Sequence, residues 1–557
     1  MEKTMRFLSI AALALVGTMM TGCSSEDNFT AQPQQQVADK GNVVTMTATV
    51  GFDEQTATRA LAIDYTNKKL TKTFADGDKI AVIYENTSGT MVKAETAALT
   101  ATDITSGGKS AKITVTMTDP KASGTLKYIY PAAMAGATDV DYTKLNTQNG
   151  TLASLASNLD LAVFEGTLTA EKTLPASASL ANKLAILALK IKNSDGTNDL
   201  TSTITGMILS DGPNTYSITG KDTDGRIYAA IQATSGANIL CFATTASGNY
   251  AKSLTGKTYA ANNIYDLGLK MDAATTVSLA SVTEDTEVGN CSILSGTLAN
   301  NVKISIADGA TVLLKDVTIN GTNNDSYTWA GITCSGDATI ILDGTNSVKG
   351  FYEDYPGIYM PVDKTLIIQG NGLLTATSNG YGAGIGGGDV IACGNIKILG
   401  GSITASANSY GAGIGSGCTG ECGDITISGG TVTATGGKDA AGIGSAEKDQ
   451  AGYQSKCGNI TISGGTVTAT GRGKGAGIGT GYQGICGTIT ITSDVNKVTA
   501  KMDNDGCDVI GNGTGGTCGT VTIGGMVYYY YDGKNREYPN NGLNYLRQNS
   551  LTYPSAQ

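Results

Sequence analysis

The sequence contains no histidine among its 557 residues. This absence excludes Ser-His and Cys-His nucleophile pairs, imidazole general bases and histidine-ligated metals. Tryptophan occurs once, and charged residues make up only 15% of the chain, with a net charge of −10. Such an acidic balance does not suit nucleic acid as a partner. The composition therefore favours a binding or structural protein over an enzyme.

Long apolar segments are absent after residue 22, so we expect no membrane-spanning helix there. Residues 1–22 have the layout of a signal peptide, in which Lys3 and Arg6 precede an apolar run over residues 7–20. The run ends in M-T-G-C, which resembles a bacterial lipobox with Cys23 as the lipid acceptor. We predict a surface-exposed lipoprotein held in the outer-membrane lipid through Cys23. An ordinary signal peptide followed by an incidental cysteine is the alternative.

Two regions follow the anchor. Residues 23–44 are rich in Gln, Asp and Ser, which predicts a flexible tether. Over residues 45–272, alternating segments such as residues 79–84 and 112–116 predict short strands separated by Asp-Gly and Ser-Gly turns. Many short strands without helical periodicity indicate an all-β fold of the β-sandwich class.

Several segments of this region carry a family likeness: F-A-D-G-D-K-I-A-V from Phe74, Y-I-Y-P from Tyr128, and G-K-T-Y followed by N-I-Y-D-L after Gly256. They resemble the fimbrillin-like domains of Bacteroidetes surface pili. The resemblance implies a two-part β-sandwich pilin that polymerises with other fimbrillin subunits by strand exchange. It also implies a trypsin-like cut that releases the first strand, and the bond between Arg59 and Ala60 lies where that cut would fall. An exposed arginine in an ordinary turn is the alternative.

From residue 281 onward the sequence repeats at intervals of about 29 residues. The glycine motif G-A-G-I-G, or a variant of it, is followed by a cysteine after 11, 11, 17, 11 and 11 residues in five successive copies. Within a copy, apolar and polar residues alternate, and Gly-Gly pairs supply the bends. One copy alone cannot bury its apolar face, whereas stacked copies can. The isoleucines expected to form the internal ladder are Ile385, Ile414, Ile443, Ile478 and Ile510.

This pattern predicts a parallel β-helix over residues 281–525. A propeller blade would need about 40 residues and four hairpin strands, so the unit is too short for that fold. We expect a right-handed helix from the general preference of parallel crossovers. The Tyr-rich tail over residues 526–557 is expected to cap the open end, because repeat stacks need a terminal cap.

Ten cysteines remain after Cys23, and an even number in an exported protein invites disulfides. Five of them recur at the same position of successive copies, where neighbouring coils would present their Cβ atoms side by side. These are Cys393, Cys422, Cys457, Cys486 and Cys518. We therefore expect a ladder of free buried thiols, although Cys418 and Cys422 are close enough in sequence to close a small loop. No paired Cys-x-x-Cys unit supports a zinc site.

The repeat resembles surface β-helix domains that are described as carbohydrate-binding. In solenoids, insertions collect on the loops that bind, and here the widest turn spans residues 445–456. Tyrosine rings offer apolar faces to sugars, while carboxylates suit sugar hydroxyls or calcium, the one cofactor left open. A solvated turn without a ligand is the alternative. The candidate binding residues are Asp389, Glu421, Glu447, Asp449, Tyr453 and Tyr482.

The sequence therefore predicts a cell-surface adhesin, as a tip or accessory subunit of a fimbria, whose β-helix binds a glycan or a host surface protein. A non-polymerising glycan-binding lipoprotein is the second hypothesis. A polysaccharide-cleaving enzyme is the third, since many β-helices have that activity. Those hydrolases resemble one another in clustered aspartates and a Gly-His-Gly turn, both missing here, so we expect no catalytic residues.

Overall fold

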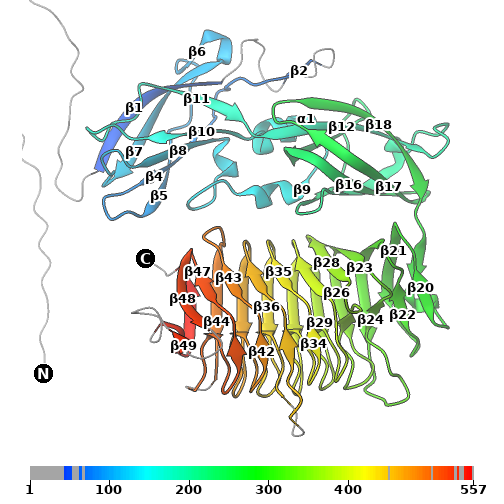
Figure 1. Cartoon of the computed structure of the whole chain (residues 1–557). Coiled ribbons are helices and arrows are strands. Elements are labelled where there is room, and N and C mark those ends of the chain that lie inside the picture. The colour runs from blue at the N-terminus through cyan, green and yellow to red at the C-terminus, as the bar shows by residue number, and fades with distance from the viewer. Residues whose placement is uncertain are drawn as a thin grey trace, which may run out of the picture.

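The protein is described by a computed structural model that covers residues 43–52, 62–64, 69–448, 452–503, 506–531, 536–537 and 545–554. It confirms the all-β class. Two modules of antiparallel-rich sheet lie end to end, and the chain then turns back so that a stack of parallel coils runs beneath them (Figure 1). Within these ranges, no helix is both long and apolar enough to cross a membrane.

The first module is one eight-stranded sheet in the order β5-β4-β8-β10-β11-β1-β7-β6, folded around its own core. A separate hairpin pairs β2 (Ala62–Asp64) with β3 (Lys69–Thr71). The strands of the sheet are β1 (Val43–Phe52), β4 (Ala81–Glu85), β5 (Met91–Glu95), β6 (Ile104–Thr105), β7 (Ser110–Thr118), β8 (Thr125–Tyr130), β10 (Ala162–Thr167) and β11 (Ser177–Asn182).

Strand β1 lies inside this sheet and not at its edge. It pairs antiparallel with β7 over nine residue pairs and parallel with β11 over four. Its side chains alternate, so that Met46, Ala48 and Val50 are buried while Thr45, Thr47 and Thr49 are exposed. The first strand of the chain therefore completes both the sheet and its core.

The second module is another eight-stranded sheet, in the order β15-β12-β18-β17-β16-β13-β14-β9, with a separate core. A short helical segment precedes β10, made of α1 (Leu152–Ser154) and a wider turn over Leu155–Leu159. The strands are β9 (Thr147–Gln148), β12 (Leu184–Asn193), β13 (Ile204–Ser210), β14 (Thr215–Ile218), β15 (Ile227–Gln232), β16 (Thr234–Thr245), β17 (Gly248–Tyr259) and β18 (Ile264–Ala273).

The coils of the β-helix form three sheets. The widest has nineteen strands and takes two strands from each full coil, while the others have nine and four strands. In the sheet of nine the strands are β20 (Thr286–Val288), β22 (Ile304–Ile306), β24 (Ile332–Cys334), β27 (Ile358–Tyr359), β30 (Ile385–Gly386), β33 (Ile414–Gly415), β37 (Ile443–Gly444), β41 (Ile478–Gly479) and β45 (Ile510–Gly511). In the sheet of four they are β34 (Glu421–Cys422), β38 (Lys456–Cys457), β42 (Ile485–Cys486) and β46 (Thr517–Cys518).

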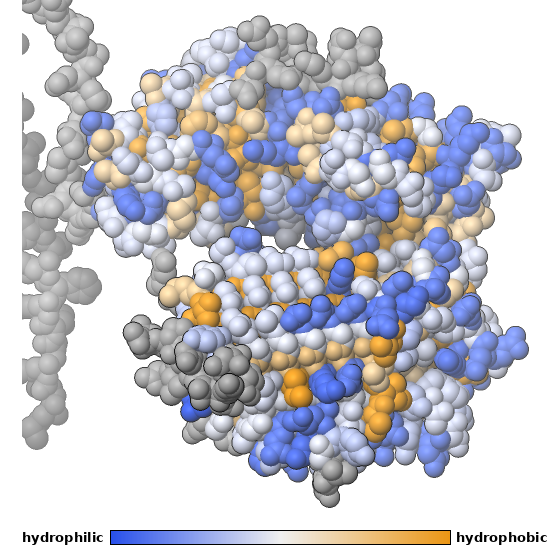
Figure 2. All heavy atoms as spheres, viewed as in Figure 1, coloured by the Kyte–Doolittle hydropathy of each residue, from blue (hydrophilic) through white to orange (hydrophobic). Residues whose placement is uncertain are grey.

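The nineteen-stranded sheet runs the length of the stack, and its coils appear as parallel rows of atoms on the surface (Figure 2). Its strands are β19 (Thr276–Ser278), β21 (Ser292–Thr297), β23 (Ala310–Asn320), β25 (Ala338–Asp343), β26 (Thr345–Lys349), β28 (Thr365–Gly370), β29 (Leu373–Thr377), β31 (Asn395–Ile398), β32 (Ser402–Ser406), β35 (Ile425–Ile427), β36 (Thr431–Thr435), β39 (Ile460–Ile462), β40 (Thr466–Thr470), β43 (Ile489–Ile491), β44 (Lys497–Lys501), β47 (Val521–Ile523), β48 (Met526–Tyr531), β49 (Arg536–Glu537) and β50 (Ser550–Tyr553).

The predicted isoleucine ladder is present. In-register parallel pairing joins Ile385, Ile414, Ile443, Ile478 and Ile510, all of them at most 1% exposed. Each isoleucine is followed by a glycine with φ between +129° and +139°, a conformation that favours glycine. Stacking these coils buries the apolar faces that single copies leave open.

The cysteines of the repeat also stack in register. β34, β38, β42 and β46 place one cysteine of each coil above the next, and Cys393 extends the column by a bridge to Cys422. All ten described cysteines are free, including Cys418 and Cys422. Neighbouring thiols, and then burial, raise the pKa of Cys422 well above its usual value. The thiols of the ladder are therefore protonated and serve as packing groups, not as reactive thiolates.

Antiparallel strands end the parallel stack. β48 pairs antiparallel with β47, and β50 pairs antiparallel with β44. Tyr529 on β48 is fully buried, and its hydroxyl accepts a hydrogen bond from Asn512 at 3.2 Å. The tail thus covers the apolar interior of the last coil, where the next parallel coil would otherwise lie.

The second module packs directly on the first coils of the β-helix. Gln369, 5% exposed, donates to the Ser210 hydroxyl at 2.9 Å, and Asn371 donates to the backbone oxygen of Thr215 at 2.8 Å. Apolar side chains that point outward from the coils fill the rest of this junction, so the two parts share a small core. That core consists of Ile208, Phe242, Ala251, Ile293, Leu313 and Ile341.

Candidate ligand-binding edge of the β-helix

In-register coils place equivalent turn residues in columns. Four residues before the ladder isoleucine are Tyr381, Tyr410, Asp439 and Lys474 in successive coils. Four residues after it are Asp389, Cys418, Glu447 and Tyr482. The two columns are adjacent, because backbone nitrogens of the second bond to carbonyl oxygens of the first, as from Cys418 to Tyr381 at 3.0 Å and from Tyr482 to Asp439 at 2.8 Å. We call these eight residues the turn edge.

Aromatic rings of the turn edge stack from coil to coil. The rings of Tyr381 and Tyr410 lie 5.6 Å apart between centroids and are inclined by only 13°. The Lys438 ammonium lies 5.5 Å from the Tyr410 ring centroid, and the Lys474 ammonium lies 4.0 Å from that of Tyr482. The edge therefore presents one stacked pair of rings, together with two rings that each have a lysine cation over one face.

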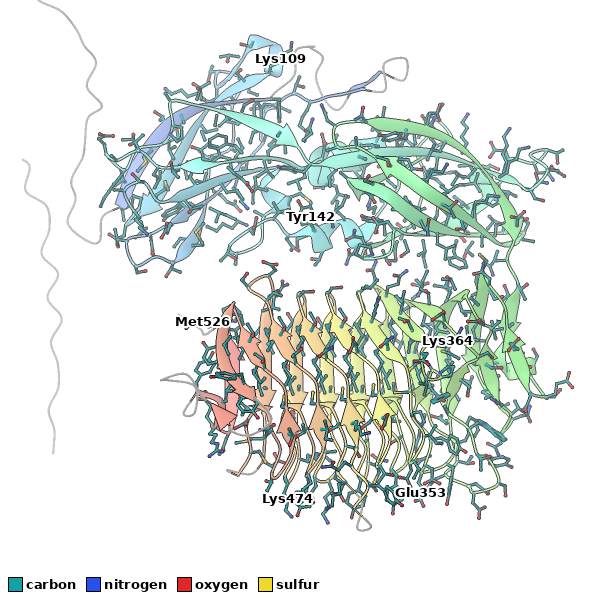
Figure 3. The ribbon with its side chains drawn as sticks, viewed as in Figure 1. Lys109, Tyr142, Glu353, Lys364, Lys474 and Met526 are labelled. Carbon is teal, nitrogen blue, oxygen red and sulfur yellow. The ribbon has the colours of Figure 1, made fainter. Side chains whose placement is uncertain are left out.

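Two earlier coils have a cluster of aromatic residues near the same turn, packed against the core of the β-helix. Trp329 stands three residues before Ile332 of β24. In the next coil, Tyr355 stands three residues before Ile358, which pairs with Ile332. The ring centroid of Trp329 lies 5.4 Å from that of Tyr327 and 5.6 Å from that of Phe351. In Figure 3, Glu353 and Lys474 project from the same lower edge, although they belong to coils far apart in the stack.

Carboxylates at the turn edge lie close enough to shift one another's protonation. Burial and the nearby charge of Asp439 raise the pKa of Glu447 to about 7, against the opposing effect of Lys438. Burial, Asp389 and Glu353 likewise raise the pKa of Asp354. Among the described residues, no three His, Cys, Asp or Glu side chains gather as a metal site.

The raised pKa of Glu447 predicts a pH-dependent stability. Folding favours its protonated form, so the contribution of this group is fully present below about pH 4.5 and is lost as the pH rises through about 7. We expect Glu447→Gln and the wild type to unfold at equal denaturant concentrations at pH 4. The variant should become the more stable protein as the pH approaches 8. Urea titrations followed by circular dichroism at several pH values measure this, and a pH-independent difference would contradict it.

The structure brings together three of the predicted binding residues and separates a fourth. Asp389, Glu447 and Tyr482 share one column of the turn edge. Tyr453, in the lengthened turn, is 71% exposed. Glu421 instead begins β34, where its carboxylate lies 2.5 Å from the Lys456 ammonium.

Other predicted sites lie outside the described residues. These are the lipid acceptor Cys23, the cleavage site at Arg59 and Ala60, and the candidate ligand residue Asp449. Sequence reasoning missed the first column of the turn edge, which includes Tyr381, Tyr410 and Lys474. Counting back four residues from each ladder isoleucine would have found that column.

Comparison with known proteins supports the repeat. The family model of the beta helix repeat matches residues 366–389, 396–418, 425–447 and 460–482. No curated protein matches the chain.

Several solved structures are similar to part of the chain, among them proteins of Bacteroides and Parabacteroides species. One is a protein of Bacteroides ovatus whose proposed role is cell adhesion. It is 13% identical, the match covers 42% of this chain and 95% of that chain, and the TM-score is 0.25. A fimbrial assembly protein of Parabacteroides distasonis has 10% identity, coverage of 41% and 90%, and a TM-score of 0.24. A proposed polysaccharide-binding protein of Bacteroides thetaiotaomicron has 9% identity, coverage of 40% and 91%, and a TM-score of 0.24.

These likenesses are too distant to assign a function to this chain. The repeat and the in-register coils agree with one another, since the four matched segments each include a ladder isoleucine and the column residue that follows it. The C-terminal half of the chain is a domain of β-helix repeats, joined to two all-β modules whose sequence motifs resemble those of fimbrillins.

Proposed function

We propose that this protein is a cell-surface adhesin whose β-helix binds a glycan along the turn edge. The observation that carries the proposal is that tyrosine rings and charged side chains occupy equivalent turn positions of four successive coils. Sugar rings stack on aromatic faces. Sugar hydroxyl groups donate hydrogen bonds to carboxylates and accept them from ammonium groups. A row of equivalent weak sites suits an extended polymer, because successive contacts act together.

The proposal assigns binding and not catalysis to this edge. A hydrolase needs two carboxyl groups at opposite sides of one bond, with separate roles as acid and base. The carboxyl groups here fall into two groups on different coils, one around Glu447 with Asp439 and one around Asp354 with Asp389.

Loss of an aromatic ring from the turn edge should weaken glycan binding. We expect Tyr410→Ala and Tyr482→Ala each to reduce affinity several-fold, since one stacking contact contributes about 1 kcal/mol. Tyr142→Ala is the matched control, because Tyr142 is an exposed tyrosine on the second module (38% exposed) and lies away from the turn edge. A glycan array identifies the glycan that binds best, and calorimetry with that glycan measures the affinity of the wild type and of each variant.

The array should use the soluble chain from Ser24 to Gln557. The isolated β-helix would expose Ile293, Leu313 and Ile341, which are buried against the second module. A hit that all three tyrosine variants bind equally well would move the site away from the turn edge. Absence of any hit would point to a protein receptor.

The lipid anchor is part of the proposal. We expect Cys23→Ala to move the protein from the detergent phase to the aqueous phase when cells are extracted and phase-separated, because its only proposed membrane anchor is the acyl chain. The same extraction of the wild-type chain is the control. A variant that still follows the detergent would refute anchoring through this residue.

We further propose that the chain enters a fibre by strand exchange. Strand β1 lies between β7 and β11, so its release would leave a gap inside the sheet for a strand from another subunit. The proposed cut after Arg59 falls between β1 and β2, which is the connection that must be broken. A solitary glycan-binding lipoprotein is the alternative in which β1 stays in place.

A further inference from the structure

Lys72 and Asp160 form a buried pair where the first module meets the second. Lys72 directly follows β3, and Asp160 lies between the turn over Leu155–Leu159 and β10. Lys72 Nζ is 3.0 Å from Asp160 Oδ1, and the two side chains are 3% and 5% exposed. Lys72 Nζ also donates to the backbone oxygen of Asp160. The pair therefore has little contact with water and is held at contact distance.

Aromatic rings enclose the amine. The Lys72 nitrogen lies 5.6 Å from the ring centroid of Phe52 and 5.3 Å from that of Tyr130. Phe52 stacks on Phe74 at 4.4 Å, and Tyr130 meets both rings edge-on, at 5.5 and 5.3 Å. The Tyr130 hydroxyl donates to Asp78 at 2.7 Å, so the polar end of this ring has its own partner.

Such an apolar site disfavours two full charges. Burial lowers the pKa of Lys72, and burial raises the pKa of Asp160, while the attraction between the two groups acts in the opposite direction on each. Both net directions favour the pair of neutral amine and carboxylic acid. In that neutral pair the amine is a nucleophile, and the carboxyl group it would attack has its Oδ1 3.0 Å from the nitrogen, in a site with little access to water.

We propose that the Lys72 amine and the Asp160 carboxyl group condense into an amide that cross-links the first module. The nitrogen lone pair attacks Asp160 Cγ, and a C–N bond forms. The C–OH bond then breaks, and the hydroxyl leaves as water with a proton taken from the nitrogen. One amide and one water result, and no oxidant, metal or nucleotide is consumed.

The fixed geometry of the site favours a reaction that free amines and carboxylic acids do not undergo readily in water. Two groups held in contact behave as though at very high concentration, and the product amide leaves neither group able to become a buried charge. The linked residues are 88 positions apart in sequence, so the bond closes a long loop. Both residues follow Arg59, so the cross-link would remain in a chain from which β1 has been removed.

The mass of the purified full-length soluble chain tests the proposal. We expect the wild type to be lighter than its sequence by one water molecule, with a single tryptic peptide that joins the segments around Lys72 and Asp160. Trypsin should also fail to cleave after Lys72, because the modified side chain is no longer basic. A peptide map is needed because other dehydrations would give the same intact mass.

Two variants of similar shape sharpen the test. In Asp160→Asn the same attack would release ammonia in place of water, so its product should have the same mass as the linked wild type. Lys72→Met removes the nucleophile and should have the mass of its sequence. A wild-type chain with the mass of its sequence, from which trypsin cleaves normally after Lys72, would overturn the proposal even if both variants failed to fold.

Discussion

Replacement of Gly444 by alanine should break the β-helix, whereas the same replacement at Gly511 should be tolerated far better. Both glycines occupy the same column and have nearly the same backbone, with φ of +135° and +129°. A Cβ on Gly444 would lie 1.9 Å from the backbone oxygen of Gly479 in the next coil. A Cβ on Gly511 would meet only the side chain of Asp508, whose Oδ2 is nearest at 3.1 Å, because β45 is the last strand of its sheet in the described part of the chain.

Comparison of these two variants separates the cost of backbone strain from the cost of pushing two coils apart. Alanine at this φ carries a conformational strain of about 1–3 kcal/mol at either position. Only Gly444→Ala must also push two hydrogen-bonded coils apart, and we expect its total loss to exceed about 4 kcal/mol. Urea unfolding monitored by circular dichroism measures both variants. Equal losses would mean that backbone strain, and not coil spacing, explains the glycine column.

Removal of residues up to Arg59 should destabilise the first module strongly, because it takes out β1. The strand supplies the buried side chains of Met46, Ala48 and Val50 and nine register pairs with β7. Each buried aliphatic side chain of this size contributes roughly 1–3 kcal/mol, which together approaches the whole stability of a typical domain. A chain that begins at Ala60 should therefore show an early unfolding transition or associate with other copies.

A peptide of residues 43–52 should restore the stability of this shortened chain. The same peptide with Val50→Asp should fail, because residue 50 faces the core, whereas Thr47→Asp should still work because Thr47 is exposed. Thermal unfolding with and without each peptide gives the comparison. On surface material from cells, N-terminal sequencing should find chains that begin at Ala60. Only chains that begin at Cys23 would argue against strand exchange.

The β-helix could be predicted from sequence because its order is local and periodic. Ile414 and Ile443 occupy equivalent positions of successive repeats, and this regular spacing forms one apolar ladder only if the coils stack. The sequence predicted only part of the turn edge. The insertion after the glycine motif favoured Tyr453, whereas Tyr410 lies just before that motif. Which turn residues lie side by side depends on where the coil bends.

Contacts between distant segments left no signal in the sequence. Leu313 and Ile341 alternate like any strand residues, and nothing in their pattern shows that the second module covers their outward side. The pair of Lys72 and Asp160 is similarly invisible, because a lysine near a turn and an aspartate before a strand are ordinary surface residues. Only the three-dimensional arrangement encloses them with Phe52 and Tyr130.

The junction between the second module and the β-helix has a consequence for how such chains can vary. Its buried apolar contacts come from β21, β23 and β25, near the start of the stack. A chain with one coil more or fewer in the regular repeat would keep this junction and its C-terminal cap unchanged. Its turn edge would lengthen or shorten by about 4.8 Å for each coil. If the turn edge binds a polymer as proposed, gain or loss of a single repeat in the gene would directly change the length of polymer that is bound.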